Sequence, residues 1–356
     1  MTTELGVIEG YYGTPWSCAA RTETMQFLAP HGYRFFLYAP KADAFLRKRW
    51  RELHPEEDAR ALAAFAGACR SAGVRFGVGL SPYEIYRAFD AEAQAALADK
   101  LAMLDALGSD DLAILFDDMR GDLPGLAATQ VDILHWIGAR TKATRLILCP
   151  TYYTDDPVLD RVFGARPPDY LRELGATLDR KIEIFWTGEE VCAREFTPGH
   201  LQRVADDLRR KPFLWDNYPV NDGPRMCPHL HLRAFTGRSA RIGAHIAAHA
   251  VNPALQPVLS RIPLLTLAQS YAQGDTYAYG AAFDAAAETV AGPALAAQLR
   301  RRLTLFQDSG LERMEAQAVA NLLQDFGADP HPAAQEVAAF LRGEYRIAPG
   351  MIEPHG

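Results

Sequence analysis

The chain has 356 residues, of which 49% are hydrophobic and 23% are charged, the balance of a soluble globular protein. Its formal net charge of -7 argues against a general affinity for nucleic acid or for an anionic membrane surface, because both are themselves negative. The first residues carry neither a basic segment nor a long apolar one, and no window is apolar for long enough to span a membrane. We therefore expect a cytoplasmic protein without nucleic-acid or membrane partners.

Short apolar runs alternate with longer segments of helical periodicity through most of the chain. A run that is apolar throughout is typical of a strand buried on both faces of a parallel sheet. Between the runs, helical spacing is clearest at 56–72, 91–107, 127–142 and 197–209. The runs predict strands at 5–8, 35–39, 76–80, 113–116, 146–149, 182–186, 213–215 and 247–251.

Eight alternations of strand and helix predict an α/β protein with a closed (β/α)8 TIM barrel. An open doubly wound sheet competes with it, but no Gly-x-Gly-x-x-Gly follows the first strand, as a dinucleotide site would require. From about Pro263 onward, Ala- and Leu-rich segments replace the strand-like runs. We therefore predict a barrel over residues 1–262 and a small helical appendage over 263–356, whose helices could pair with those of a second copy as a homodimer. Helical segments are expected at 280–289, 293–306, 311–326 and 332–342.

The cysteines and histidines do not form a metal-binding pattern. The five cysteines are scattered, with no Cys-x-x-Cys pair and no zinc-like spacing, so we expect reduced thiols. His245 and His249 are four residues apart and could share a helix face. No acidic residue of a His-Glu-x-x-His motif accompanies them. We predict neither a metal nor a cofactor.

The fourth predicted strand ends in two adjacent acids, Asp117 and Asp118. Acids at the carboxyl end of a parallel strand lie where α/β folds bind ligands. A helix-capping Asp followed by a solvated one is the competing structural interpretation, because Pro124 and Gly125 mark a loop soon afterwards. This stretch alone leaves both interpretations open.

Aromatic, amide and hydroxyl-bearing residues follow the other predicted strands. In a closed barrel they would converge on one rim. The set contains few cations and no glycine-rich loop, so it favours a neutral, polyhydroxylated ring with an amide over a phosphate. Its members are Gly10, Tyr11, Tyr12, Lys41, Tyr153, Thr187, Trp215, Asn217, Asp222 and Asn252.

Seven motifs at these strand ends, in this order, resemble those of glycoside hydrolase family 84. This is the family of O-GlcNAcases and bacterial β-N-acetylglucosaminidases. The match covers about residues 6–253 and is more specific than an isolated Asp-Asp pair. The matching segments are Gly6–Ser17, Leu37–Lys41, Leu115–Asp118, Cys149–Tyr153, Trp186–Gly188, Leu214–Asn217 and Val251–Pro253.

The resemblance implies a (β/α)8 barrel that hydrolyses terminal β-linked N-acetylglucosamine with retention, through an oxazoline formed by the substrate. Asp117 would orient the acetamido N–H, and Asp118 would act as general acid and then as base. Two adjacent carboxylates should push one pKa up, which would leave Asp118 protonated beside an ionised Asp117. By the same resemblance, Gly10, Lys41, Asn217, Asp222 and Asn252 would hold the sugar, and Tyr153, Thr187, Val191 and Trp215 would wall the acetamido pocket beside Tyr12.

Two other functions are consistent with a barrel of this kind. One is a non-catalytic barrel that binds N-acetylglucosamine, which the complete set of acids and sugar-holding positions argues against. The other is a metal-dependent hydrolase, which the absence of His-x-His after the first strand argues against. The expected partner is a glycoprotein or another glycoconjugate bearing N-acetylglucosamine, and the sequence does not identify the group to which the sugar is attached.

Overall fold

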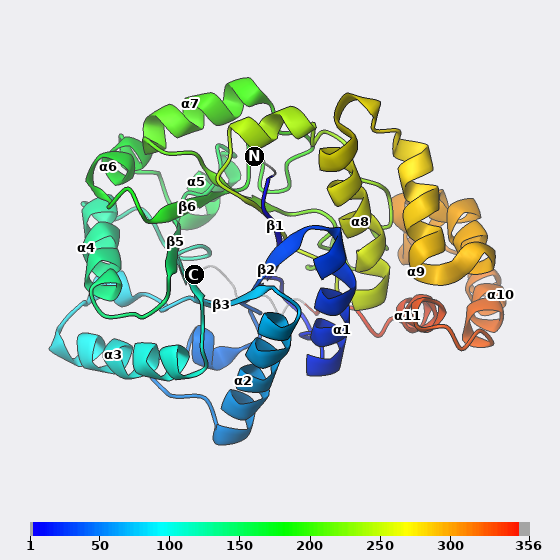
Figure 1. The fold of residues 1–356 in the computed structure, drawn as a ribbon, viewed down its shortest axis with the longest axis horizontal. Coiled ribbons are helices and arrows are strands. Elements are labelled where there is room, and N and C mark those ends of the chain that lie inside the picture. Colours follow the sequence, from blue (N-terminus) through cyan, green and yellow to red (C-terminus); the bar gives the residue numbers. More distant parts are fainter. Residues whose placement is uncertain (1–2, 349–356) are drawn as a thin grey trace.

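A computed structural model describes residues 3–348. Eight parallel strands close into a barrel in chain order, with β8 paired to β1 (Figure 1). The predicted TIM barrel is therefore confirmed. Its strands are β1 (Leu5–Glu9), β2 (Tyr33–Tyr38), β3 (Arg75–Leu80), β4 (Asp111–Leu115), β5 (Arg145–Cys149), β6 (Glu183–Trp186), β7 (Phe213–Asp216) and β8 (His249–Val251).

The strand residues are almost all buried, because side chains fill the barrel on one face and helices cover the other. Strand β4 begins at Asp111, two residues before the predicted start, and ends before the two acids. The apolar pattern missed this start because Asp111 is a charged residue that is buried against arginines. Strand β8 is shorter than predicted and begins at His249.

Helices surround the barrel as a ring (Figure 1). Three of them begin at side-chain caps: Ser17 Oγ accepts from the N–H of Ala20, Asp90 Oδ1 from that of Ala93, and Thr197 Oγ1 from that of His200. Helix α8 packs against α1 and so closes the ring. The helices are α1 (Cys18–Leu28), α2 (Glu56–Ser71), α3 (Ala91–Ala106), α4 (Leu126–Gly138), α5 (Val158–Phe163), α6 (Tyr170–Thr177), α7 (Pro198–Leu208) and α8 (Pro257–Gln273).

Three further helices lie together beside α8, on one side of the barrel (Figure 1). They are α9 (Tyr279–Arg301), α10 (Ala316–Gly327) and α11 (Pro332–Leu341), with a π-helical turn at Leu305–Ser309. The segments predicted at 280–289 and 293–306 correspond largely to two arms of α9, which is kinked at Gly292 (φ 74°) before Pro293.

The predicted division between residues 262 and 263 falls inside α8. We propose the α8–α9 junction as the boundary of the appendage, because α8 completes the helical ring. The structure contains one chain, so pairing of two copies through the C-terminal helices stays a prediction. Within residues 3–348, no helix combines the length and apolar character needed to cross a bilayer.

Candidate active site

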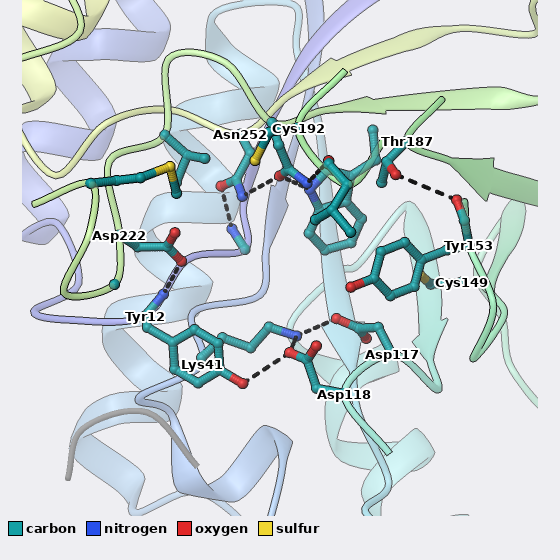
Figure 2. A pocket seen from close by; sticks show the side chains of 17 residues that line it. Tyr12, Lys41, Asp117, Asp118, Cys149, Tyr153, Thr187, Cys192, Asp222 and Asn252 are labelled. Atoms are coloured by element: carbon teal, nitrogen blue, oxygen red, sulfur yellow. Dashed lines mark hydrogen bonds and ion pairs between the residues drawn. The ribbon is translucent and has the colours of Figure 1, made fainter. Parts of the chain in front are cut away.

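A cavity of about 230 Å³ lies at the carboxyl ends of the barrel strands (Figure 2). Its volume is below the range of about 300–1,000 Å³ typical of drug-sized ligands, which suits a single sugar ring. The predicted catalytic and sugar-contacting residues line it, except Tyr11, which is buried and donates its hydroxyl hydrogen bond to Glu9 Oε1 at 3.1 Å. The sequence interpretation did not include five further lining residues, namely Cys149, Cys192, Val220, Gly223 and Met226.

Asp117 and Asp118 reach the cavity from the turn that follows β4. Neighbouring side chains on an extended strand point to opposite sides, so both acids can face one cavity only where the backbone turns. Asp118 adopts the left-handed conformation (φ 56°) at this point. Both carboxylates consequently contact the ammonium group of Lys41: Asp117 Oδ2 accepts its hydrogen bond, and Asp118 Oδ2 lies 3.2 Å from Nζ.

Lys41 follows β2 and lies between the two acids (Figure 2). Burial opposes its charge, but Asp117 and Asp118 outweigh that effect and raise the pKa of the ammonium group. A cation between two carboxylates weakens their mutual repulsion. We predicted from adjacency that Asp118 is protonated and Asp117 ionised. With Lys41 between the two carboxylates, their adjacency alone does not lead to this difference.

One carboxylate oxygen of Asp117 is unpaired. Oδ1 is buried and has no hydrogen-bond partner within residues 3–348, whereas Oδ2 is bound to Lys41. Leaving a buried acceptor unsatisfied costs about 1–3 kcal/mol, and more for a charged group. Because Asp117 lines the cavity, an N–H group of a ligand there could satisfy this oxygen.

Tyr12 links the two acidic parts of the cavity. Its hydroxyl donates to Asp118 Oδ2 at 2.9 Å, and its backbone N–H donates to Asp222 Oδ2, also at 2.9 Å (Figure 2). Removal from water is the main cause that raises the pKa of Asp222 to about 6, and the negative charge of Asp118 also raises it. The hydrogen bond from the Tyr12 N–H and the charge of Lys41 act in the opposite direction and lower this pKa. Asp222 is therefore more readily protonated than an ordinary aspartate.

Two asparagines fix the opposite wall. Asn217 Oδ1 accepts from Trp215 Nε1 and from Asn252 Nδ2, both at 3.0 Å, and Asn217 Nδ2 donates to the carbonyl of Val191 at 2.8 Å. Asn252 Oδ1 accepts from the N–H of Gly10 at 3.2 Å. A Cβ atom on Gly10 would lie 2.3 Å from Trp215 Cζ2, so only glycine allows this close approach of the indole ring.

The remaining wall is formed by Tyr153, Thr187 and two cysteines. The ring of Tyr153 projects into the cavity (Figure 2), and burial raises its pKa, so the phenol stays neutral. Thr187 Oγ1 donates to the carbonyl of Glu190 at 3.3 Å. Burial also raises the pKa of the Cys149 thiol. Cys192 is exposed as a residue, but removal of its thiol from water and the charge of Asp222 raise its pKa to about 12, so neither cysteine is an activated nucleophile.

Of the residues that were missed, Cys149 could have been found, because it opens the Cys-Pro-Thr-Tyr-Tyr motif. Val220, Gly223 and Met226 lie in the irregular segment between β7 and β8, where no periodic pattern marks them. No cluster of three or more His, Cys, Asp or Glu side chains suited to a metal ion occurs in the part of the chain that the structure describes.

Three comparisons relate this chain to known proteins. A family model described as beta-N-acetylglucosaminidase matches residues 5–305. The chain is 29% identical to the Protein O-GlcNAcases of Mus musculus and Rattus norvegicus over 278 residues, which cover 75% of this chain but only 30% of each relative's length. A mutant of the O-GlcNAc hydrolase of Thermobaculum terrenum is 30% identical, with a TM-score of 0.77, over 95% of this chain and 74% of that one.

Proposed function

The chain belongs to the β-N-acetylglucosaminidase family, as its resemblance to glycoside hydrolase family 84 led us to expect, and we propose that it removes terminal β-linked N-acetylglucosamine with retention of configuration. We propose that the sugar is linked, in the substrate, to the hydroxyl of a protein Ser or Thr. The similar proteins are named O-GlcNAcase and O-GlcNAc hydrolase, which supports this substrate class. The observation that carries this proposal is the buried, unpaired Asp117 Oδ1 beside Asp118, on the wall of a sugar-sized cavity.

In the first step, the acetamido oxygen of the substrate attacks the anomeric carbon and displaces the oxygen of the attached group, which gives an oxazoline that keeps its N–H proton and is therefore positively charged (an oxazolinium ion). This is the substrate-assisted route, in which the enzyme supplies no nucleophile. Asp117 Oδ1 accepts the acetamido N–H, and its negative charge stabilises the positive charge that develops on that nitrogen. Asp118 donates its proton to the leaving oxygen as the glycosidic C–O bond breaks.

In the second step, ionised Asp118 takes a proton from water, and that water attacks the anomeric carbon. The C–O bond of the oxazoline breaks, the acetamido group is restored, and two displacements at one carbon return the original configuration. Lys41 and Tyr12 both contact Asp118 Oδ2 and stabilise its ionised form. We therefore propose that the sugar draws Lys41 away from Asp118, toward a sugar hydroxyl, before Asp118 acts as an acid.

The other cavity residues have roles that their contacts support. Asp222 and Asn252 offer carboxylate and amide groups to the sugar hydroxyls, and the backbone of Gly10 lies beside them. The aromatic faces of Trp215 and Tyr153 enclose the acetamido methyl group.

A second cavity gives room for the group attached to the sugar. It measures about 580 Å³ and shares Cys192, Asn217 and Met226 with the first. Tyr218 and Tyr279 line it, and Tyr279 is 37% exposed. Aromatic side chains that are partly exposed beside a sugar site are suited to contact a polypeptide or a second sugar.

Assays with a chromogenic N-acetyl-β-glucosaminide test the proposal. We expect hydrolysis with retention, inhibition by a thiazoline that mimics the oxazoline, and no effect of a chelator. A glycopeptide with N-acetylglucosamine on Ser should also be hydrolysed. Tight binding of the thiazoline without turnover would instead identify a non-catalytic N-acetylglucosamine-binding barrel, and loss of activity on chelation would identify a metal-dependent hydrolase.

A further inference from the structure

The carboxylate of Glu336, in α11 of the appendage, caps the first turn of barrel helix α8. Its Oε1 accepts from the N–H of Val258 and its Oε2 from that of Leu259, both at 2.8 Å. The first N–H groups of a helix have no partner within the helix. Gln256, the residue before α8, makes no side-chain cap, so these two N–H groups are satisfied from the C-terminal helices.

The segment just before α8 joins three parts of the cavity rim. It begins at Asn252, which lines the cavity. The carbonyl of Ala254 accepts from Trp16 Nε1 at 3.1 Å, and Trp16 lies in the same loop as Tyr12. The N–H of Leu255 donates to Asn221 Oδ1 at 2.9 Å, and Asn221 directly precedes Asp222 in the chain.

Burying the carboxylate of Glu336 costs free energy, which is unexpected if the cap contributed only to stability. Its side chain is only 8% exposed, and burial raises its pKa to about 7 in spite of the two N–H groups and Arg261. Arg261, in α8, lowers the pKa of Glu336 through its charge, but it also forms an ion pair with Glu23 at 3.7 Å. Its charge therefore does not neutralise Glu336 alone. A buried carboxylate contributes little net stability, but two charge-assisted hydrogen bonds fix geometry strictly.

We propose that Glu336 is a positioning residue, through which the C-terminal helices hold Tyr12, Asp222 and Asn252 in the geometry that binds the sugar. The inference rests on the proposed function, because it assigns sugar binding to this rim. Glu336 acts through the first turn of α8 and does not line the cavity. The appendage is then part of the binding site's framework.

Substitution of Glu336, with the adjacent Gln335 as control, tests this proposal. Gln335 is exposed, and within residues 3–348 its side chain bonds only to the carbonyls of Gly327 and Asp329. We expect Glu336→Ala to raise KM for the chromogenic glucosaminide, and Kd for the thiazoline, about tenfold, with a smaller change in kcat. Glu336→Gln keeps one acceptor and should recover part of the affinity, whereas Gln335→Ala should change neither constant.

The outcomes separate a positioning role from a merely structural one. If Glu336→Ala lowers the unfolding midpoint but leaves KM and the thiazoline Kd within twofold of the parent values, the proposal is overturned. If the parent protein neither hydrolyses nor binds these compounds, the proposed function fails, and hydrogen exchange decides about Glu336. Faster exchange of 10–16, 219–223 and 252–259 in Glu336→Ala than in Gln335→Ala would support the positioning role, and equal exchange would overturn it.

Discussion

Strand β4 carries carboxylates at both ends, and their surroundings differ. At its start, Asp111 accepts from Arg75 Nε at 3.0 and 3.2 Å and lies 3.9 Å from Arg145. Beyond its end, Asp117 and Asp118 share one lysine, and one oxygen of Asp117 has no partner within residues 3–348. The strand therefore begins with one acid that is paired with arginines and is followed by two acids that are only partly neutralised.

The difference extends to another acid that lines the cavity, although Asp216, the last residue of β7, is paired with Arg238 at 2.7 and 2.8 Å. At the amino-terminal ends of the strands, Arg75 and Arg145 connect three acids. Although burial opposes ionisation, the two arginines hold the pKa of Glu4 below its usual value, whereas burial raises the pKa of Asp111 in spite of them. At the carboxyl-terminal ends, the pKa of Asp222 is raised to about 6. Paired charges at the amino-terminal face fit a role in stability, and the incompletely paired acids that line the cavity fit chemistry. The acids of the amino-terminal network are Glu4, Asp111 and Glu183.

The largest expected effect comes from replacing an acid beyond the end of β4. We expect Asp118→Asn to lower kcat about 100- to 10,000-fold, as for loss of a general acid. Asparagine tolerates the left-handed conformation of Asp118, so the turn should persist. The loss, measured with a series of aryl glucosaminides, should be greatest for poor leaving groups, and an equal loss for all of them would contradict the acid role. Asp111→Asn, the matched change at the start of the strand, should leave kcat unchanged.

Removal of a cation from the amino-terminal network should lower stability and leave catalysis unchanged, the opposite of the effect expected for Asp118→Asn. Arg145 donates to Glu4 at 3.0 Å and to Glu183 at 3.1 Å. We expect Arg145→Met to lower the free energy of unfolding by about 2 kcal/mol, less than for a fully buried pair because Glu4 and Glu183 are partly exposed. Denaturant titration measures the loss, while KM and kcat should not change. An altered KM would show that the two faces are coupled.

A smaller effect is expected from a single added methyl group on the cavity wall. In Gly10→Ala the new Cβ would meet Trp215, so the indole ring and its hydrogen bond to Asn217 must shift. We expect KM to rise about tenfold, since packed walls tolerate extra atoms poorly. Gly67→Ala is the control. Gly67 lies in α2, and no atom beyond the neighbouring residues of the helix lies within 4 Å of the Cβ that the substitution adds, so this variant should be slightly more stable than the parent protein. Equal KM values for the two variants would exclude a role for Gly10 in shaping the wall.

The sequence predicts those parts of the molecule that depend on local pattern. Continuous apolar runs identified the eight strands, and position after a strand was sufficient to gather Asp118, Tyr153 and Asn252 at one rim. The position of Lys41 between two acids could not be predicted, because it depends on side-chain directions across β2 and β4. Glu336 was hidden for a similar reason: its partners, Val258 and Leu259, lie almost eighty residues earlier in the chain.

The smallest expected effect is a pH dependence set by Asp222. Its folded-state pKa of about 6 lies above the ordinary 3.8, so the folded protein holds this proton more tightly than the unfolded chain does. The contribution of Asp222 to stability is therefore present at low pH and falls as the pH rises from 3.8 to about 6. Binding should follow the opposite trend, because the ionised carboxylate is the better acceptor for sugar hydroxyls.

We accordingly expect KM to be about twofold higher near pH 6 than near pH 8, where Asp222 is almost fully ionised. In Asp222→Asn, KM should be higher throughout but should no longer change across this interval. Steady-state kinetics with a substrate whose leaving group does not titrate here would measure both proteins. If the pH dependence of KM persists in Asp222→Asn, a group other than Asp222 is responsible. The remaining candidates in the cavity are then Asp117, Asp118 and Lys41, which contact one another.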